Sequence, residues 1–166
     1  MSRTVIGVMG GTSADETTAR NALQLGRLIA ENGWVLLSGG RRTGVMQASV
    51  TGAHQAGGLT VGVLFDDDPA LAAEGLDIVI PTGLGAARNI VNVLASHVVV
   101  ACRGTGGTLS EIAMALRFRK PVVLLDFDPG EAFLSAAAAD ARWSHAATAA
   151  EAATLVRGYL AEMGRA

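Results

Sequence analysis

The stretch HVVVACRGTGGTLSEIAMAL, residues 97–116, decides the fold. An apolar run of strand length passes through a glycine-rich turn into a segment with helix-like apolar spacing. Such units build parallel α/β sheets, because each strand is followed by a helix that packs back onto the sheet. Between Arg103 and Glu111 there are three glycines and two threonines, which offer little side chain for packing. This turn therefore belongs either to a self-capped helix or to a site that holds a phosphate beside an acid.

The same alternation of strand and helix extends along the chain in both directions. Strands are predicted at residues 5–9, 34–40, 59–65, 77–83, 97–102 and 120–128. Helices are predicted at 44–56, 86–96 and 108–118, after an earlier helix that a capping box at Ser13 and Glu16 opens and Asn32-Gly33 ends. The segment 66–77 is predicted as a loop, and the Ala-rich part after residue 128 is predicted as helix.

These elements predict the architecture. Strands that are apolar along their whole length are buried on both faces, which is typical of a parallel sheet between two layers of helices. The fold class is therefore α/β, a Rossmann-like doubly wound parallel sheet with helices on both faces. No internal repeat or linker divides the chain, so residues 1–166 are expected to form a single domain.

Composition excludes several classes of protein. The net charge is −2 and no basic run is present, so no nucleic acid is expected as a partner. No apolar stretch is long enough to span a membrane, and the N-terminus lacks a signal-peptide pattern, so no membrane partner is expected and the protein is predicted to be cytoplasmic. Cys102 is the only cysteine, which excludes an intramolecular disulfide and is interpreted as a small buried hydrophobe.

Ligands of doubly wound sheets bind beyond the carboxyl ends of the strands. Glycine loops that lead into helices expose backbone N–H groups there and favour anions, although glycine is also the ordinary residue of tight turns. Arg41 and Arg103 add donors that suit phosphate. From these loops we predict the following ligand-binding residues: Gly10, Gly11, Thr12, Ser38, Gly39, Gly40, Arg41, Gly44, Arg103, Thr105 and Gly106.

Several binding and catalytic motifs are absent from the sequence, and their absence limits the class of ligand that we expect. The loop after the first strand is not G-x-G-x-x-G and the second strand lacks an acidic residue at its end, so NAD is not expected. No P-loop and no G-x-S-x-G elbow is present. His54, His97 and His145 lack the spacing of metal ligands, and residues 66–68 are interpreted as an acidic turn before proline, so no metal site is predicted.

Two charged residues have open interpretations. Arg88 stands near the start of a helix, where the dipole disfavours a cation, so it either faces an anion or a carboxylate or is simply exposed. Thr108 and Glu111 have the T-x-x-E spacing of a capping box, and spacing alone favours the capped helix over a ligand site.

Two segments resemble a known family. SGGRRTGVMQASVTGAHQAGGLTVGVL (38–64) is similar to the part of the "lonely guy" proteins that follows their second strand. ARN (87–89) and SHVVVACRGTGGTLSEIAMAL (96–116) resemble the part that carries their signature P-G-G-x-G-T-x-x-E. The resemblance covers about residues 5–126. Many relatives carry the label "lysine decarboxylase", but no lysine for pyridoxal phosphate can be identified here, so no PLP is expected.

The resemblance implies a function and site residues. The signature enzymes of the family are phosphoribohydrolases that split a nucleoside 5′-monophosphate, such as AMP or a cytokinin nucleotide, into base and ribose 5-phosphate. It places the catalytic glutamate at Glu111, the catalytic arginine at Arg88 and the phosphate-holding positions at Gly104, Gly107 and Thr108. A carboxylate in that place would stabilise an oxocarbenium ion or orient water. Members of the family form homodimers or larger assemblies, so a homodimer or homotetramer is expected.

The chain departs from the signature in ways that favour another branch. Arg103 replaces the proline and Thr105 replaces the second glycine. The contexts A-R-N and L-S-E differ from the E-R-K and L-E-E of the hydrolases and look like those of the molybdenum-cofactor carrier proteins. We therefore predict a protein that binds a phosphorylated small molecule, with the molybdenum cofactor as its cargo; the alternative is the phosphoribohydrolase.

Overall fold

The computed structural model describes residues 2–138 and 140–165. Within them, the strands are β1 (Val5–Met9), β2 (Val35–Ser38), β3 (Thr60–Leu64), β4 (Ile78–Pro81), β5 (Val98–Ala101), β6 (Val122–Leu125) and β7 (Trp143–Ala146). The helices are α1 (Glu16–Glu31), α2 (Gly44–Gln55), α3 (Arg88–Ala95), α4 (Gly106–Arg117), α5 (Glu131–Ala137) and α6 (Ala149–Glu162), with short 3-10 turns η1 (Pro69–Leu71) and η2 (Gly85–Ala87). All strand pairs are parallel, in the order β4-β3-β2-β1-β5-β6-β7.

The order of the strands reverses between β1 and β5. The chain runs outward from β1 to β4, returns through α3, and continues outward from β5 on the other side of β1. The register pairs Ile6 with Val98 and Met9 with Ala101, so β1 and β5 end side by side. This junction is the topological switch point, at which ligands of doubly wound sheets bind.

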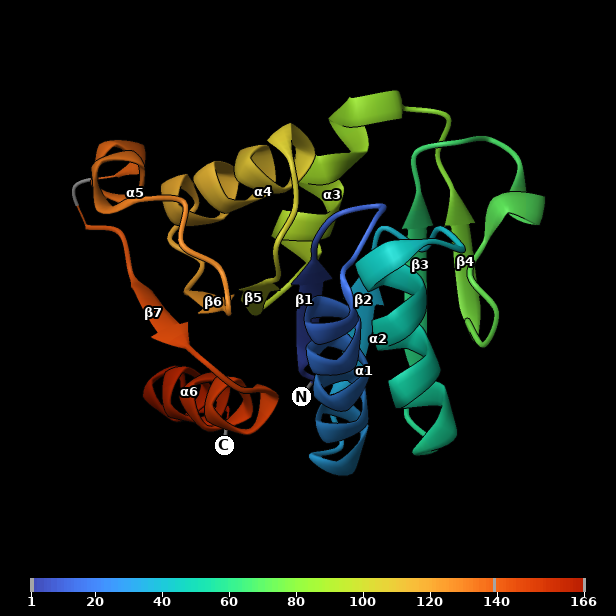
Figure 1. Ribbon diagram of the computed structural model, residues 1–166, viewed down its shortest axis with the longest axis horizontal. Helices are drawn as coiled ribbons and strands as arrows, with labels where there is room; N and C mark the ends of the chain where they lie inside the picture. Colours follow the sequence, from blue (N-terminus) through green and yellow to red (C-terminus); the bar gives the residue numbers. More distant parts are fainter. Residues whose placement is uncertain (1, 139, 166) are drawn as a thin grey trace.

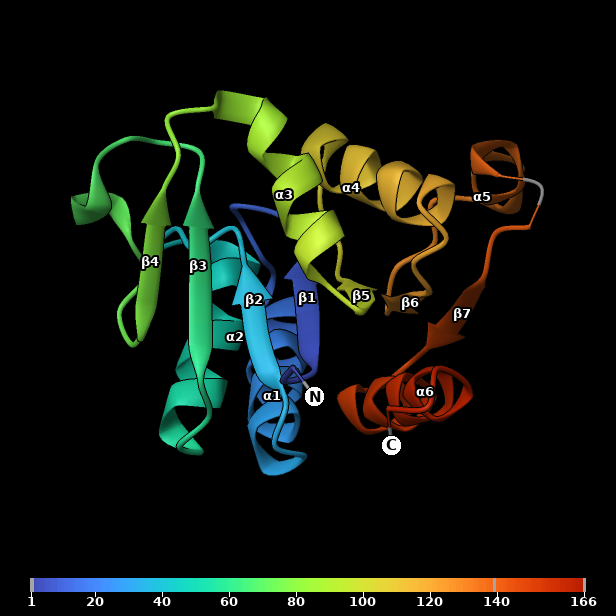
Figure 2. The same ribbon diagram turned by 180° about the vertical axis from the view of Figure 1, so that it is seen from behind.

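Helices cover both faces of the sheet (Figures 1 and 2). α1, α2 and α6 lie on one face, and α3, α4 and α5 lie on the other. A right-handed crossover places a helix on one face when the chain moves outward in one direction and on the opposite face when the direction reverses. The predicted fold class is therefore confirmed.

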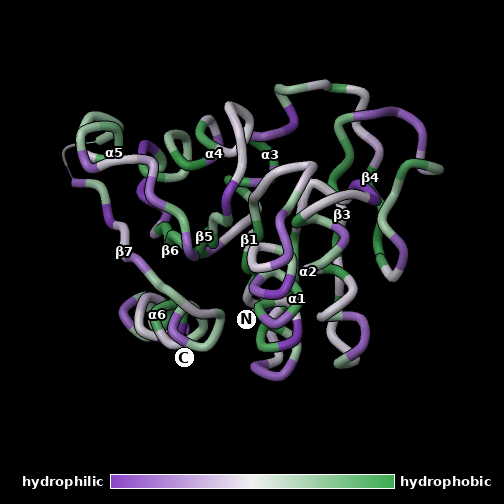
Figure 3. The backbone as a smooth tube through the Cα atoms, viewed as in Figure 1, coloured by the Kyte–Doolittle hydropathy of each residue, from purple (hydrophilic) through white to green (hydrophobic). Residues whose placement is uncertain are grey.

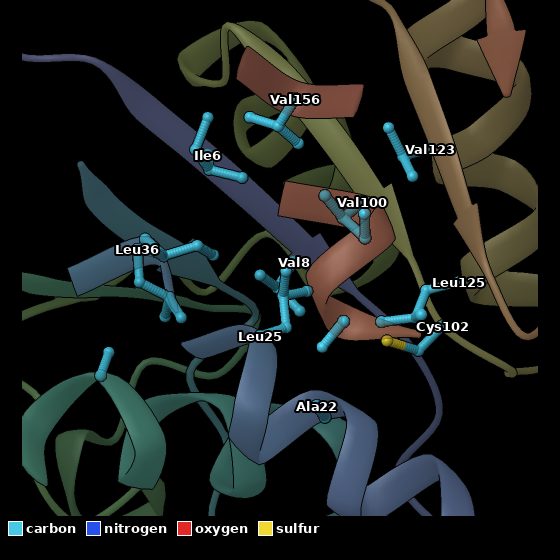
Figure 4. Packing of buried hydrophobic residues seen from close by; sticks show 14 of the residues in the cluster. Ile6, Val8, Ala22, Leu25, Leu36, Val100, Cys102, Val123, Leu125 and Val156 are labelled. Carbon is cyan, nitrogen blue, oxygen red and sulfur yellow. The ribbon is translucent and has the colours of Figure 1, made fainter. Parts of the chain in front are cut away.

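Alternating side chains of the strands fill the two layers of the core. In β5, Val98 and Val100 pack toward α1 and α6, while Val99 and Ala101 pack toward α3 and α4. Figure 4 shows the first layer, in which side chains of the central strands meet Leu25 of α1 and Val156 of α6. The central strands are hydrophobic along most of their length, whereas β7 and parts of the helices are hydrophilic (Figure 3). Small aliphatic side chains suffice because both faces are covered.

Glycines bring α1 and α2 into close contact. A Cβ on Gly26 would overlap the carbonyl oxygen of Ser49 in α2, and a Cβ on Gly52 would overlap the carbonyl oxygen of Leu23 in α1. The two backbones therefore approach each other more closely than any larger residue permits. This contact fixes α2, and with it the loop after β2, against the first βα unit.

The structure corrects the sequence analysis after residue 128. The segment predicted as helix contains β7, which pairs with β6 from Val122–Trp143 to Leu125–Ala146. β7 is short and only its last residue, Ala146, is buried, so it lacks the apolar run that marks the central strands. Pairing with β6, rather than a local apolar pattern, makes this segment a strand.

Two predicted helix starts are also wrong. Asp15, not Ser13, caps α1, and its carboxylate accepts a hydrogen bond of 2.7 Å from the backbone N–H of Thr18. This bond lowers the pKa of Asp15. α4 begins at Gly106 rather than Thr108, with Thr105 as its N-cap. The end of α1 at Asn32 and Gly33 is confirmed, with Gly33 at φ +72°.

The outer surface of α3 is apolar. Ile90 and Leu94 are exposed there, Leu94 to 49%, beside the exposed Leu84 that precedes the helix. The expected homodimer or homotetramer would cover such a surface, but the oligomeric state stays a prediction. Among the described residues no helix combines the length and hydropathy needed to cross a membrane.

The α1–α2 contact predicts opposite effects for two glycine substitutions. Gly52→Ala should lower the free energy of unfolding by about 2–3 kcal/mol, because the new methyl group overlaps backbone. Gly158→Ala, at an exposed position of α6 with open space around it, should raise it by about 0.5–1 kcal/mol. Urea denaturation of both variants measures the difference; equal effects would contradict the close contact.

Candidate functional site

A cavity of about 130 Å³ opens at the switch point, beyond the carboxyl ends of β1 and β5. The loops after β1, β2 and β5 and the first turns of α3 and α4 form its walls. The following predicted site residues line it: Gly10, Gly11, Thr12, Gly39, Arg88, Thr105, Gly107, Thr108 and Glu111. Segments that are far apart in the sequence therefore meet in one place.

Backbone hydrogen bonds hold the loops together. The N–H of Gly11 donates to the carbonyl oxygen of Arg103 at 3.0 Å, which joins the loop after β1 to the loop after β5. The N–H of Val45, in the first turn of α2, donates to the carbonyl oxygen of Gly11 at 3.1 Å. The loop after β1 is thus fixed on both sides.

The N-terminus of α4 opens onto the cavity without a side-chain cap. Thr105 has extended backbone angles but makes no capping hydrogen bond. Helical hydrogen bonding begins with the N–H of Leu109, which donates to the carbonyl oxygen of Thr105 at 3.0 Å. The N–H groups of residues 106–108 precede it and have no partner within the helix, so they are suited to an anion.

Glu111 does not cap α4, so the interpretation that spacing favoured is wrong. Its side chain lines the cavity, the residue is 7% exposed, and it accepts a hydrogen bond of 3.1 Å from Nδ2 of Asn92 in α3. Burial raises the pKa of Glu111 from its ordinary value of 4.5 to about 7, against the opposing effects of Asn92 and Arg88. Burial in the cavity wall thus favours the protonated form of Glu111.

Arg88 is also buried and faces the cavity. The residue is 8% exposed, and its Nη1 donates to the carbonyl oxygen of Val63 at 2.9 Å. Burial lowers its pKa, while Glu111 and Asp66 act in the opposite direction. Its Nε is buried and has no hydrogen-bond partner among the described residues. Such a donor is costly to bury unless something else accepts from it.

Gly39 makes room for this arginine. A Cβ at position 39 would overlap Nη1 of Arg88 and lie 2.7 Å from Sδ of Met46. Both neighbours are the ends of flexible side chains, so a methyl group there displaces them rather than the backbone. Gly39 therefore sets the position of the guanidinium group.

Sequence reasoning missed several residues of the cavity wall, among them Asn89 and Met46. Nδ2 of Asn89 donates to Oγ of Ser110 at 3.1 Å, and Oγ of Ser110 donates to the carbonyl oxygen of Gly107 at 2.6 Å. Asn89 is the third residue of A-R-N and Ser110 is the second of L-S-E. Asn89 and Ser110, which each depart from the hydrolase pattern in the sequence, are therefore in direct contact.

Other predicted residues do not line the cavity. Ser38 accepts a hydrogen bond of 3.1 Å from the N–H of Gly40, which stands at φ +72° and turns the chain. Gly44, at φ +51°, packs against the backbone of the loop after β1. Gly106 has open space around its Cα. Ser38, Gly40 and Gly44 shape the loops, whereas Gly106 is the first residue of α4 and contributes its N–H group to the helix N-terminus beside the cavity.

Two larger hollows adjoin the cavity, and both share Thr12 with it. One, of about 360 Å³, is bounded by Arg41, Arg42 and Leu71. The other, of about 420 Å³, is bounded by Asp15, Arg103 and Gly104. Arg41, Arg103 and Gly104 therefore lie beside the cavity and not within it.

Cys102 has the structural role that was expected, and His97 also has a structural role. Cys102 is buried in the core layer that faces α1 and α6, and burial raises the pKa of its thiol to about 12. Nδ1 of His97 accepts a hydrogen bond of 3.0 Å from the N–H of Val5. Neither residue lines the cavity.

Known structures resemble this one over nearly its whole length. A molybdenum cofactor binding protein from the phototrophic bacterium Rippkaea orientalis is 45% identical, with a TM-score of 0.90 over 96% of this chain and 99% of the other. The molybdenum cofactor carrier protein from Chlamydomonas reinhardtii is 42% identical, with a TM-score of 0.85 over 96% and 99% of the two chains.

A curated relative and a family model extend the comparison. An uncharacterized protein of Archaeoglobus fulgidus is 45% identical over 120 residues, which is 72% of this chain and 78% of the relative. The model of the SLOG cluster4 family matches residues 3–155. The resemblance inferred from the sequence, to the lonely-guy superfamily and its carrier branch, is thereby confirmed. The chain belongs to the SLOG cluster4 family.

Proposed function

We propose that the protein binds the molybdenum cofactor as cargo and holds its phosphate in the cavity at the β1–β5 switch point. The observation that carries the proposal is the buried guanidinium group of Arg88, a residue that lines the same cavity as the uncapped N-terminus of α4 and whose Nε has no hydrogen-bond partner among the described residues. A phosphate monoester supplies acceptors to both at once. The cofactor-binding relatives, at 42–45% identity over almost the full chain, support this assignment.

Glu111 is compatible with an anion in the cavity. An ionised carboxylate would repel a phosphate, but the pKa of about 7 keeps a large share of Glu111 protonated near neutral pH. A protonated carboxyl group donates a hydrogen bond to a phosphate oxygen instead. The residues present therefore fit a phosphate group, with Arg88 and the N–H groups of α4 as donors.

Removal or displacement of the guanidinium group should weaken binding. Arg88→Ala and Gly39→Ala should each lower the affinity for molybdenum cofactor released from a donor enzyme by at least about tenfold, since a charge-assisted hydrogen bond is lost. The measurement is the molybdenum and pterin retained by the protein after gel filtration. Gly39→Ala is the sharper variant, because it keeps the arginine and displaces its guanidinium group together with the end of the Met46 side chain.

The control is Gly158→Ala, which adds the same methyl group in α6, far from the cavity lining. It should retain cofactor as the wild type does. Retention by Arg88→Ala and Gly39→Ala equal to that of the control would refute a phosphate site at Arg88.

One observation favours a second function, hydrolysis of a nucleoside 5′-monophosphate. Glu111 is a buried carboxyl group in the cavity rather than a helix cap, and it shares that cavity with Arg88. In such a reaction the carboxyl group of Glu111 would stabilise an oxocarbenium ion or orient water, and Arg88 would hold the phosphate. The geometry alone therefore serves either a carrier or a hydrolase.

Incubation with AMP separates the two functions. A carrier leaves AMP intact, and this is the outcome we expect from chromatography of the reaction mixture. A hydrolase releases adenine and ribose 5-phosphate, and Glu111→Gln should slow that release by about a hundredfold or more. Turnover that depends on both Glu111 and Arg88 would replace the carrier proposal.

The raised pKa of Glu111 predicts a pH-dependent stability. Between pH 4.5 and 7 the carboxyl group is ionised in the unfolded chain and protonated in the folded one. Folding then takes up a proton, so the free energy of unfolding falls as pH rises through this window, by about 3 kcal/mol in total. Urea denaturation at several pH values should show this fall in the wild type and not in Glu111→Gln. Glu16→Gln, an exposed carboxyl in α1, should keep the wild-type slope.

A further inference from the structure

The cavity is too small for a whole ligand of the proposed kind. Its volume is about 130 Å³, whereas sites for cofactor-sized molecules measure roughly 300–1,000 Å³. A ligand whose phosphate lies in the cavity must therefore extend into a neighbouring hollow. The two candidates are the hollow beside Arg41 and the hollow beside Arg103, which both meet the cavity at Thr12.

The two hollows differ in the surface that they offer. The Arg103 hollow is lined by the glycine loops, by small and polar side chains and by the carboxylate of Asp15. The Arg41 hollow includes the aliphatic side chain of Leu71, which is 41% exposed and has no other evident packing role. A flat heterocycle gains free energy by covering such a side chain, so the Arg41 hollow suits a ring and the Arg103 hollow does not.

Arg41 is held rigidly at the edge of this hollow. Its guanidinium group stacks on the ring of Phe65, 4.5 Å from the centroid, and its Nε lies 3.3 Å from Oδ2 of Asp66. Its backbone forms an isolated bridge with Ala72, just after Leu71. Oδ2 of Asp66 receives no aligned hydrogen bond from the part of the chain that the structure describes, so the contact with Arg41 is electrostatic.

These contacts decide what Arg41 recognises. Asp66 balances the charge of Arg41, which disfavours a second phosphate there, while the N–H groups of the guanidinium remain available. A neutral acceptor is the complementary partner. Arginine pairs well with the carbonyl oxygen and adjacent ring nitrogen of guanine, and pterins carry the same amino-oxo pyrimidine ring as guanine.

We propose that the hollow between Thr12, Arg41 and Leu71 binds the heterocyclic end of the ligand and that Arg41 selects a ring with a carbonyl oxygen on the edge that faces it. The inference rests on the proposed function, because it concerns the other end of the same phosphorylated molecule. Arg41 is thus a specificity-determining residue, whereas Arg88 holds the phosphate.

Three commercially available probes test the proposal by isothermal titration calorimetry. Ribose 5-phosphate has no ring, AMP has a ring with an amino group, and GMP has a ring with a carbonyl oxygen. Wild-type protein should bind GMP about tenfold more tightly than AMP. Arg41→Ala should abolish this preference and leave the affinity for ribose 5-phosphate within about twofold. Leu71→Ala should weaken GMP and AMP alike relative to ribose 5-phosphate.

Variants that keep the fold make the result decisive. Arg41→Lys retains the charge beside Asp66 but loses the planar pair of donors, so it should also lose the preference for GMP. Arg20→Ala removes an exposed arginine of α1 and should behave as the wild type. The proposal is overturned if the wild type binds GMP and AMP with equal affinity. It is also overturned if Arg41→Lys loses as much affinity for ribose 5-phosphate as it loses for GMP. If Arg88→Ala weakens the binding of none of the three probes, the proposed function is overturned as well.

Discussion

The backbone hydrogen bond from Gly11 to Arg103 is the constraint on which the site depends. It forms because β1 and β5 are neighbours only where the strand order reverses, so their two loops leave the sheet side by side. Glycine at position 104 lets the loops approach, since a Cβ there would lie 2.9 Å from the backbone nitrogen of Gly11. The uncapped start of α4 is thereby placed next to the loop after β1, and the cavity follows from topology rather than from any single side chain.

Two buried groups of opposite charge face this cavity, and each is only partly compensated by the protein. The hydrogen bond of Arg88 goes to the carbonyl oxygen of Val63, and that of Glu111 comes from Asn92. Burial shifts the pKa of each group toward its neutral form. Buried groups with so few partners lower the free energy of unfolding, and a ligand that accepts hydrogen bonds supplies the missing partners. This arrangement is typical of a binding or catalytic site.

The sequence predicted the central part of the fold well, because strands such as β5 and β6 are apolar along their whole length and only a parallel sheet buries such strands on both faces. It failed for β7, whose pairing with β6 leaves little trace in a half-exposed segment. Local spacing also misassigned Glu111 as a cap, since T-x-x-E is compatible with a helix that starts two residues earlier, at Gly106. Asn89 and Asn92 went unnoticed as site residues because asparagine on a helix carries no chemical signature until its partner across α3 and α4 is known.

The contact between Asn89 and Ser110 gives the departures from the hydrolase pattern a common physical cause. The amide of Asn89, a residue that lines the cavity, donates to the hydroxyl group of Ser110, and Ser110 in turn donates to the carbonyl oxygen of Gly107 at the start of α4. Charged side chains at both positions would have to pair with each other or repel the ligand. Asn89 and Ser110 are both neutral and are hydrogen-bonded to each other, so a change at one position alters the surroundings of the other. Residues 89 and 110 therefore join α3 to α4 beside the uncapped N-terminus of α4, and the departures at these two positions form one contact.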